Sequence, residues 1–111
     1  MKHAGVAALD ALADVLEALR TRNGLHERRR GIFYVGGQAF LHFHEDRAGL
    51  FADLRQSGDW QRLPVNSTDD CARLLVAVDQ TLGQRQGTAN SKRRISALIA
   101  LALTTISTAS V

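Results

Sequence analysis

The stretch "GIFYVGGQAFLHFHEDRAGLFADLRQSGDWQRLPV", residues 31–65, contains the clearest strand and turn signals of the chain. Apolar and polar side chains alternate along most of it, which is the periodicity of a β-strand. Gly36-Gly37 and Ser57-Gly58 interrupt the alternation, and Gly-containing pairs of this kind suit the tight primed turns of two-residue hairpins. With a polar connection over residues 45–48 between the hairpins, the stretch predicts a four-stranded antiparallel meander.

A two-residue turn at Gly36-Gly37 would set the register of the first hairpin. Phe33 then faces Phe40, and Ile32 faces Leu41. Because neighbouring residues along a strand point to opposite sides, the two pairs are expected on opposite faces of the sheet.

The second hairpin is predicted to turn at Ser57-Gly58. That register places Arg55 opposite Trp60 and Asp53 opposite Arg62. Both pairs are chemically favourable, since an arginine can stack on an indole ring and an acid can pair with a base across two strands.

Helices are predicted on both sides of the meander in the chain. Residues 4–22 place apolar side chains at steps of three and four, and Asn23-Gly24 supplies a helix stop. A second helix is expected to begin at Ser67, an N-cap residue followed by acids, and to end near Gly83. The sequence therefore predicts an α+β fold in the order α-β-β-β-β-α.

The chain is expected to hold one domain over residues 1–83, followed by a polar and basic linker over 84–94. Residues 95–111 form an apolar tail without charge, predicted to be helical in part. Its hydroxylated end disfavours membrane attachment, because a bilayer span needs about 20 mostly apolar residues. Membrane association and a reading-frame artefact are the other interpretations of this tail.

The composition indicates a folded protein rather than a disordered one, with 45% hydrophobic and 23% charged residues. A net charge of +3 permits an anionic partner without requiring one. Cys71 is the only cysteine, which excludes an intramolecular disulfide and a cysteine-based metal knuckle. Acidic residues interrupt the apolar positions near the N-terminus, so no secretory signal is predicted and a cytoplasmic location is expected.

One face of the predicted sheet combines aromatic, histidine and arginine side chains. The predicted binding surface consists of Phe33, Phe40, His42, His44, Phe51, Asp53, Arg55, Trp60 and Arg62. A large exposed aromatic patch normally has a partner, so we expect a non-catalytic binding or regulatory module that contacts another protein or a second copy of itself. Nucleic acid is a further candidate, because residues 28–30 and 92–94 are two short runs of cations.

Motifs of the common enzyme classes are missing from the sequence. It contains no P-loop, dinucleotide fingerprint, Ser-His-Asp order or zinc signature. Glu45 and Asp46 could serve as a general acid and base, but adjacent acids at a strand exit are more often turn formers. We therefore expect no cofactor, and a binding protein rather than an enzyme.

A metal site is the alternative interpretation. His42 and His44 stand two residues apart, so both imidazoles point to one face of a strand, and Asp53 could add a carboxylate. Such a set suits zinc or non-haem iron. A four-residue loop before the third strand would, however, place His42 opposite Phe51 and Asp53 only diagonally from it. Because Asp53 also has Arg62 as a partner, the favoured interpretation is a half-exposed strand face in which the histidines contact water.

The pattern from Gly31 to Leu82 resembles the MmcQ/YjbR and TfoX N-terminal group of small bacterial proteins. A hairpin around a Gly-containing turn, an apolar strand, a polar turn, a further strand and a capped helix carry the resemblance, which covers about half of the chain. It implies a compact α+β domain with a DNA-binding or regulatory role and no catalytic residues. The chain departs from that pattern by its helix directly before the hairpin and by its tail.

Overall fold

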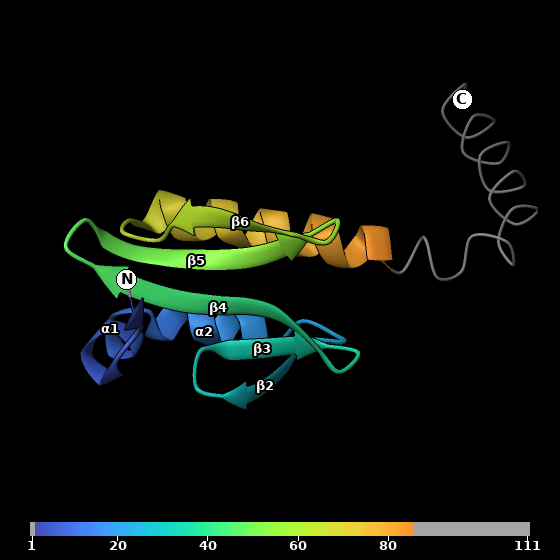
Figure 1. The fold of residues 1–111 in the computed structure, drawn as a ribbon, viewed down its shortest axis with the longest axis horizontal. Helices are drawn as coiled ribbons and strands as arrows, with labels where there is room; N and C mark the ends of the chain where they lie inside the picture. The colour runs from blue at the N-terminus through green and yellow to red at the C-terminus, as the bar shows by residue number, and fades with distance from the viewer. Residues whose placement is uncertain (1, 86–111) are drawn as a thin grey trace, which may run out of the picture. The chain divides into compact units, whose positions relative to one another are not determined.

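The computed structural model describes residues 2–85 of the chain (Figure 1). Residues up to Thr81 cluster into one compact unit, and a second unit begins at Leu82. Because the description ends at residue 85, most of the predicted linker and the whole predicted tail lie outside the described residues. Within residues 2–85 no helix is long and apolar enough to cross a membrane.

The fold is α+β, as predicted, with an antiparallel sheet and helices on one of its faces. The strands are β1 (Lys2–His3), β2 (His26–Arg29), β3 (Ile32–Val35), β4 (Gln38–Asp46), β5 (Gly49–Gln56) and β6 (Asp59–Pro64). The helices are α1 (Val6–Ala11), α2 (Ala13–Arg20) and a further helix described from 68 to 85.

Within residues 2–85 the sheet has six strands rather than the predicted four. Its main path is the meander β2-β3-β4-β5-β6, and β1 pairs with the part of β4 that extends beyond β3. The sequence HERR of β2 has no apolar alternation, because β2 is an edge strand whose side chains are mostly exposed. Gly31, at a φ of 79°, provides the turn that returns the chain from β2 into β3.

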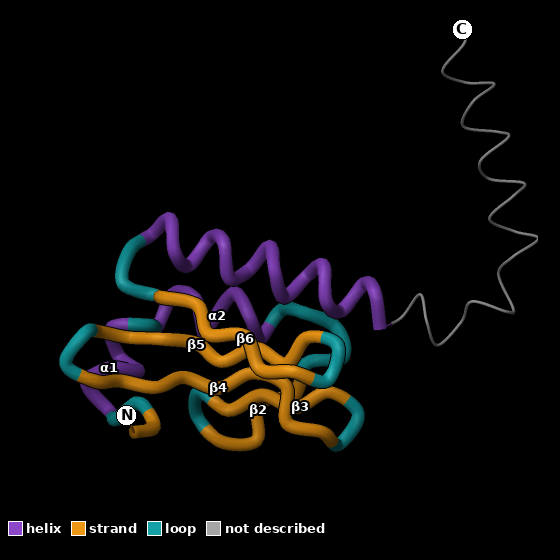
Figure 2. The backbone as a smooth tube through the Cα atoms, turned by 45° about the horizontal axis from the view of Figure 1, so that its top comes forward, coloured by secondary structure: helices purple, strands orange, loops and turns teal. Residues whose placement is uncertain are grey.

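The helices cover a single face of the sheet (Figures 1 and 2). The predicted helix over residues 4–22 is divided at Leu12, whose φ and ψ of −95° and 12° separate α1 from α2. Apolar side chains of the helices and of the covered sheet face form one core. Its members include Leu9, Leu16, Leu19, Phe33, Leu41, Phe43, Ala52, Leu54, Leu74 and Val78.

The first hairpin has the predicted turn but a different register beyond it. Gly36 and Gly37 have φ values of 56° and 82°, as a primed turn requires. A β-bulge then shifts the pairing, so that Phe33 faces Leu41 instead of Phe40. Phe33 and Phe40 are both fully buried at 0% exposure, and their predicted place on an exposed binding surface is wrong. The predicted pairing of Ile32 with Leu41 is wrong for the same reason.

The second hairpin confirms the predicted register. Ser57 and Gly58 both have positive φ values, 50° and 86°, and β5 pairs with β6 as expected from that turn. The connection between β4 and β5, in contrast, has two residues instead of four, because Asp46 pairs with Gly49. This difference moves His42 from the predicted position opposite Phe51 to a position opposite Asp53.

The predicted start of the second helix and the predicted end of the first are confirmed, whereas the second helix continues to residue 85, beyond its predicted end near Gly83 and into the predicted linker. The Asp70 amide donates a hydrogen bond of 3.1 Å to Ser67 Oγ, so Ser67 caps the helix that follows. At the end of α2, Gly24 has a φ of 84° and Leu25 is buried.

Candidate metal centre on the open face of the sheet

The face of the sheet opposite the helices is called the open face below. Alternate residues of β4, β5 and β6 point to it, and in β4 and β5 the residues between them are part of the core. Seven of the nine predicted binding residues lie there: His42, His44, Phe51, Asp53, Arg55, Trp60 and Arg62. No helix among residues 2–85 covers this face (Figure 2).

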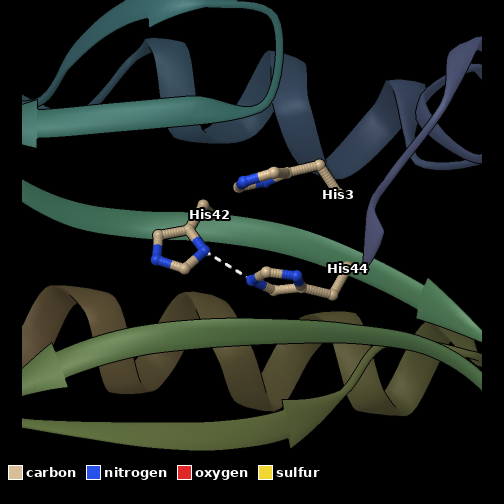
Figure 3. Close-up of side chains that lie close together, drawn as sticks. All are labelled: His3, His42 and His44. Carbon is tan, nitrogen blue, oxygen red and sulfur yellow. Dashed lines mark hydrogen bonds between the residues drawn. The ribbon is translucent and has the colours of Figure 1, made fainter. Parts of the chain in front are cut away.

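Three imidazoles meet on the open face and form what we call the histidine cluster: His3, His42 and His44 (Figure 3). One ring nitrogen of each residue lies within 4.8 Å of those of the other two. His42 Nδ1 is 2.7 Å from His44 Nε2, and the His3 and His44 rings stack with their centroids 4.9 Å apart. His3 is exposed, whereas His42 and His44 are half-buried, so the cluster is accessible from solvent.

Strand β1 brings His3 to the cluster by pairing His3 with His44. Glu45 holds this short strand in place. Its carboxylate accepts a hydrogen bond of 3.0 Å from the Gly5 amide and lies 3.3 Å from Lys2 Nζ. The hydrogen bond from Gly5 is the main reason why the pKa of Glu45 is lowered. Glu45 thus positions the N-terminal strand and is not simply a turn former.

Sequence reasoning found two members of the cluster and missed the third. The spacing of His42 and His44 marks them as neighbours on one strand face. His3 has no such signal, because β1 is only two residues long and its partner strand is about 40 residues away in the chain. A third histidine in the same short chain was the only available clue.

Asp53 adds a carboxylate to the cluster. It faces His42 across β4 and β5, and its Oδ2 lies 3.1 Å from His44 Nε2. Arg62 binds the same carboxylate through Nε at 2.9 Å and Nη2 at 3.1 Å, as the predicted pairing suggested. The structure therefore brings the alternative set of His42, His44 and Asp53 together, and Arg62 balances the charge of Asp53.

Trp60 borders the cluster on the side of β6. Its ring centroid is 4.6 Å from that of His42, and its side chain is 40% exposed. The Arg55 guanidinium lies 4.4 Å above the indole, so the predicted stacking of this pair is confirmed. As the only tryptophan in the chain, Trp60 is a fluorescent reporter for events at His42.

Comparison with protein-family models, with curated proteins and with solved structures gives no match. The resemblance to the MmcQ/YjbR and TfoX N-terminal group therefore stays a prediction. Any inference about function has to come from the geometry and chemistry of the open face.

One imidazole and one carboxyl group of the site, those of His42 and Asp53, have lowered pKa values. Burial and, next, the neighbouring His44 lower the pKa of His42 below its ordinary value of 6.5. The hydrogen bonds from Arg62 lower the pKa of Asp53 below 3.8. At neutral pH the site thus offers an uncharged His42 and an ionised Asp53, which are the protonation states that a metal ion needs.

The lowered pKa of His42 predicts that acid destabilises the fold. At pH values between the folded-state pKa of His42 and 6.5, this residue binds more protons in the unfolded chain than in the folded one. Its contribution to the free energy of unfolding is therefore complete above pH 6.5. The contribution is lost as the pH falls through the folded-state pKa. Urea denaturation in EDTA should show lower stability at about pH 5.5 than at about pH 7.5. The variant His42→Gln should reduce that difference, and an unchanged pH dependence in the variant would contradict this origin.

Proposed function

We propose that this chain binds a divalent transition-metal ion, with zinc as the reference ion, through the histidine cluster. The observation that carries the proposal is the convergence of three imidazoles from two paired strands on a surface open to solvent. Three histidines form one of the established ligand sets of zinc sites that keep a fourth position open. Imidazole is also a suitable ligand for copper, nickel and iron.

The spacing of the nitrogens supports this proposal. Zinc–nitrogen bonds of about 2.0–2.1 Å place the nitrogens of a tetrahedral site about 3.3 Å apart. The nitrogen atoms of His42 and His44 are 2.7 Å apart, and all three pairs fall within 4.8 Å. The separation of about 3.3 Å that a tetrahedral site requires lies between these two distances. A metal ion would take the place of the hydrogen bond between His42 and His44.

Asp53 has one of two roles in such a site. Its Oδ2 lies close enough to His44 Nε2, at 3.1 Å, to supply a fourth ligand. Alternatively, it is not a ligand and favours the cation by its negative charge, because His44 Nε2 has no proton to donate to it once that nitrogen binds the metal. Arg62 fixes the carboxylate in both cases, because it forms two hydrogen bonds to it.

Zinc stoichiometry tests the proposal. The full chain should be purified without a polyhistidine tag, dialysed against a slight excess of Zn²⁺ and analysed for metal, and about one ion per chain is expected. Binding should change the fluorescence of Trp60, because its ring is 4.6 Å from that of His42. Metal below about one-tenth equivalent after dialysis would show that the cluster is only a hydrogen-bonded group of histidines.

Binding of a macromolecular partner through the open face is the second candidate function, and it continues the leading interpretation of the sequence. A specific observation favours it: Trp60 is 40% exposed on the edge strand β6, where Arg55 stacks on its ring. Exposed tryptophan with a stacked arginine is typical of binding surfaces, where both residue types are enriched. This candidate requires neither a metal nor catalysis.

A further inference from the structure

A row of side chains crosses the open face beside the histidine cluster. We call it the aromatic–arginine row, and it consists of Arg28, Tyr34, Ala39, Arg55 and Trp60. The Arg28 guanidinium lies 4.3 Å above the Tyr34 ring, and Tyr34 pairs with Ala39 across β3 and β4. Arg55 Nε donates a hydrogen bond of 2.8 Å to the Ala39 carbonyl and stacks on Trp60. The row therefore runs from β2 to β6 without interruption.

We propose that the aromatic–arginine row binds single-stranded nucleic acid. This inference rests on the second candidate function and is independent of the metal site. Two aromatic rings on one face of a sheet can stack on bases, and the two arginines beside them can contact phosphates. Sheets that bind single-stranded RNA through surface aromatics, stacking two or three bases, use the same combination.

The dimensions of the row fit this ligand. Tyr34 on β3 and Trp60 on β6 are separated by three strand spacings, which corresponds to about 14 Å. Single-stranded binding modules of similar size contact several nucleotides over such a platform. Between the two aromatic residues lie the small side chain of Ala39 and the guanidinium of Arg55, which adds a positive charge to the platform.

The charges of the row favour an anion. Neither Arg28 nor Arg55 forms an ion pair with an acid within residues 2–85, and the row itself contains no acid. The nearest carboxylate on this face, Asp53, is already neutralised by Arg62. An acidic protein segment would satisfy the arginines but would not stack on the half-buried Tyr34 or on Trp60, which is 40% exposed, whereas bases would.

Fluorescence anisotropy with labelled oligonucleotides tests the inference on the full chain in EDTA, so that a failure of the metal proposal does not affect the result. Oligo-dT and oligo-U of about 12 nucleotides are the probes, because they have little secondary structure. We expect micromolar binding that weakens with salt. Tighter binding of oligo-U than of oligo-dT would identify RNA as the preferred ligand. Equal binding would indicate that the row recognises the backbone and bases of either nucleic acid. Both outcomes support the proposal.

Variants locate the binding site. Trp60→Ala should weaken binding at least about fivefold through lost stacking, and Trp60→Phe should restore part of it. Arg55→Gln and Arg28→Gln should each weaken binding several-fold. Arg47→Gln is the matched control, because it removes the same charge in the turn between β4 and β5, at the opposite end of these strands.

Three results would overturn the inference. The first is no saturable binding of either oligonucleotide at low salt. The second is an equal loss of affinity in Arg47→Gln and Arg55→Gln, which would indicate attraction by net charge alone. The third is a dimer of the wild-type chain in native mass spectrometry that Trp60→Ala dissociates, which would assign the face to a second copy of the chain.

Discussion

Replacement of His42 by alanine is expected to weaken zinc binding by at least about 100-fold. Loss of a residue that merely orients a metal ligand already reduces affinity 10- to 100-fold, and His42 would be a ligand itself. Its imidazole is central to the histidine cluster, because its Nδ1 lies 2.7 Å from His44 Nε2 and its ring contacts that of His3. Competition with a chromophoric chelator measures the affinity of the wild-type chain and of the variant.

The variant His26→Ala is the matched control for this experiment. His26 is the one histidine of the chain outside the histidine cluster, and it lies exposed on β2. Its replacement should leave the zinc affinity within about twofold of the wild-type value. Similar losses of affinity in His26→Ala and His42→Ala would mean that zinc binds to histidines non-specifically, and the metal proposal would then be wrong.

Replacement of Phe40 by alanine is expected to destabilise the fold by about 3–5 kcal/mol, the typical loss for a phenylalanine removed from a core. The bulge in β4 buries Phe40 completely together with its neighbour Leu41. A loss of this size is a large part of the total stability of a small domain, so partial unfolding at room temperature is also expected. Urea denaturation followed by circular dichroism measures the change.

Phe51→Ala is the control that separates the two possible positions of Phe40. Phe51 lies on the open face and is only half-buried, so its replacement should cost clearly less stability than that of Phe40. If Phe40 instead lay on an exposed face, as regular alternation from the Gly36-Gly37 turn suggests, the two variants would have similar stabilities. Equal losses would therefore contradict the bulge.

Features that depend on local chemistry could be predicted from the sequence. The turns at Gly36-Gly37 and Ser57-Gly58 need positive φ values that glycine adopts at low cost, and both occur where predicted. The same holds for the helix start at Ser67, where the hydroxyl accepts the Asp70 amide. Each of these signals lies within four residues of the structure that it specifies.

Features that depend on distant partners could not be predicted in this way. The bulge at Phe40 allows two consecutive large side chains, Phe40 and Leu41, to be buried, and no residue near the turn indicates it. Strand β2 is charged and exposed, and therefore lacks the alternation that marks a strand with one buried face. Its pairing with β3 depends on backbone hydrogen bonds, which do not require an apolar side chain at alternate positions.

The candidate site could be predicted only in part, because some of its residues depend on local turns and others on distant partners. Seven residues of the predicted binding surface lie on the open face, because the β5–β6 register followed from a turn that the sequence identifies. The position of Asp53 opposite His42 depended on the length of the β4–β5 connection, which polar residues alone did not determine. His3 reaches the cluster through a strand of two residues that Glu45 holds in place.

Nitrogen-15 NMR of the imidazole rings shows whether His3, His42 and His44 bind one metal ion together. On titration with Zn²⁺, the ring nitrogens of these three residues should shift in parallel and stop shifting at about one equivalent, while those of His26 stay unchanged. Ring nitrogens of the three residues that do not respond at one equivalent, or that respond no more than those of His26, would contradict the metal proposal.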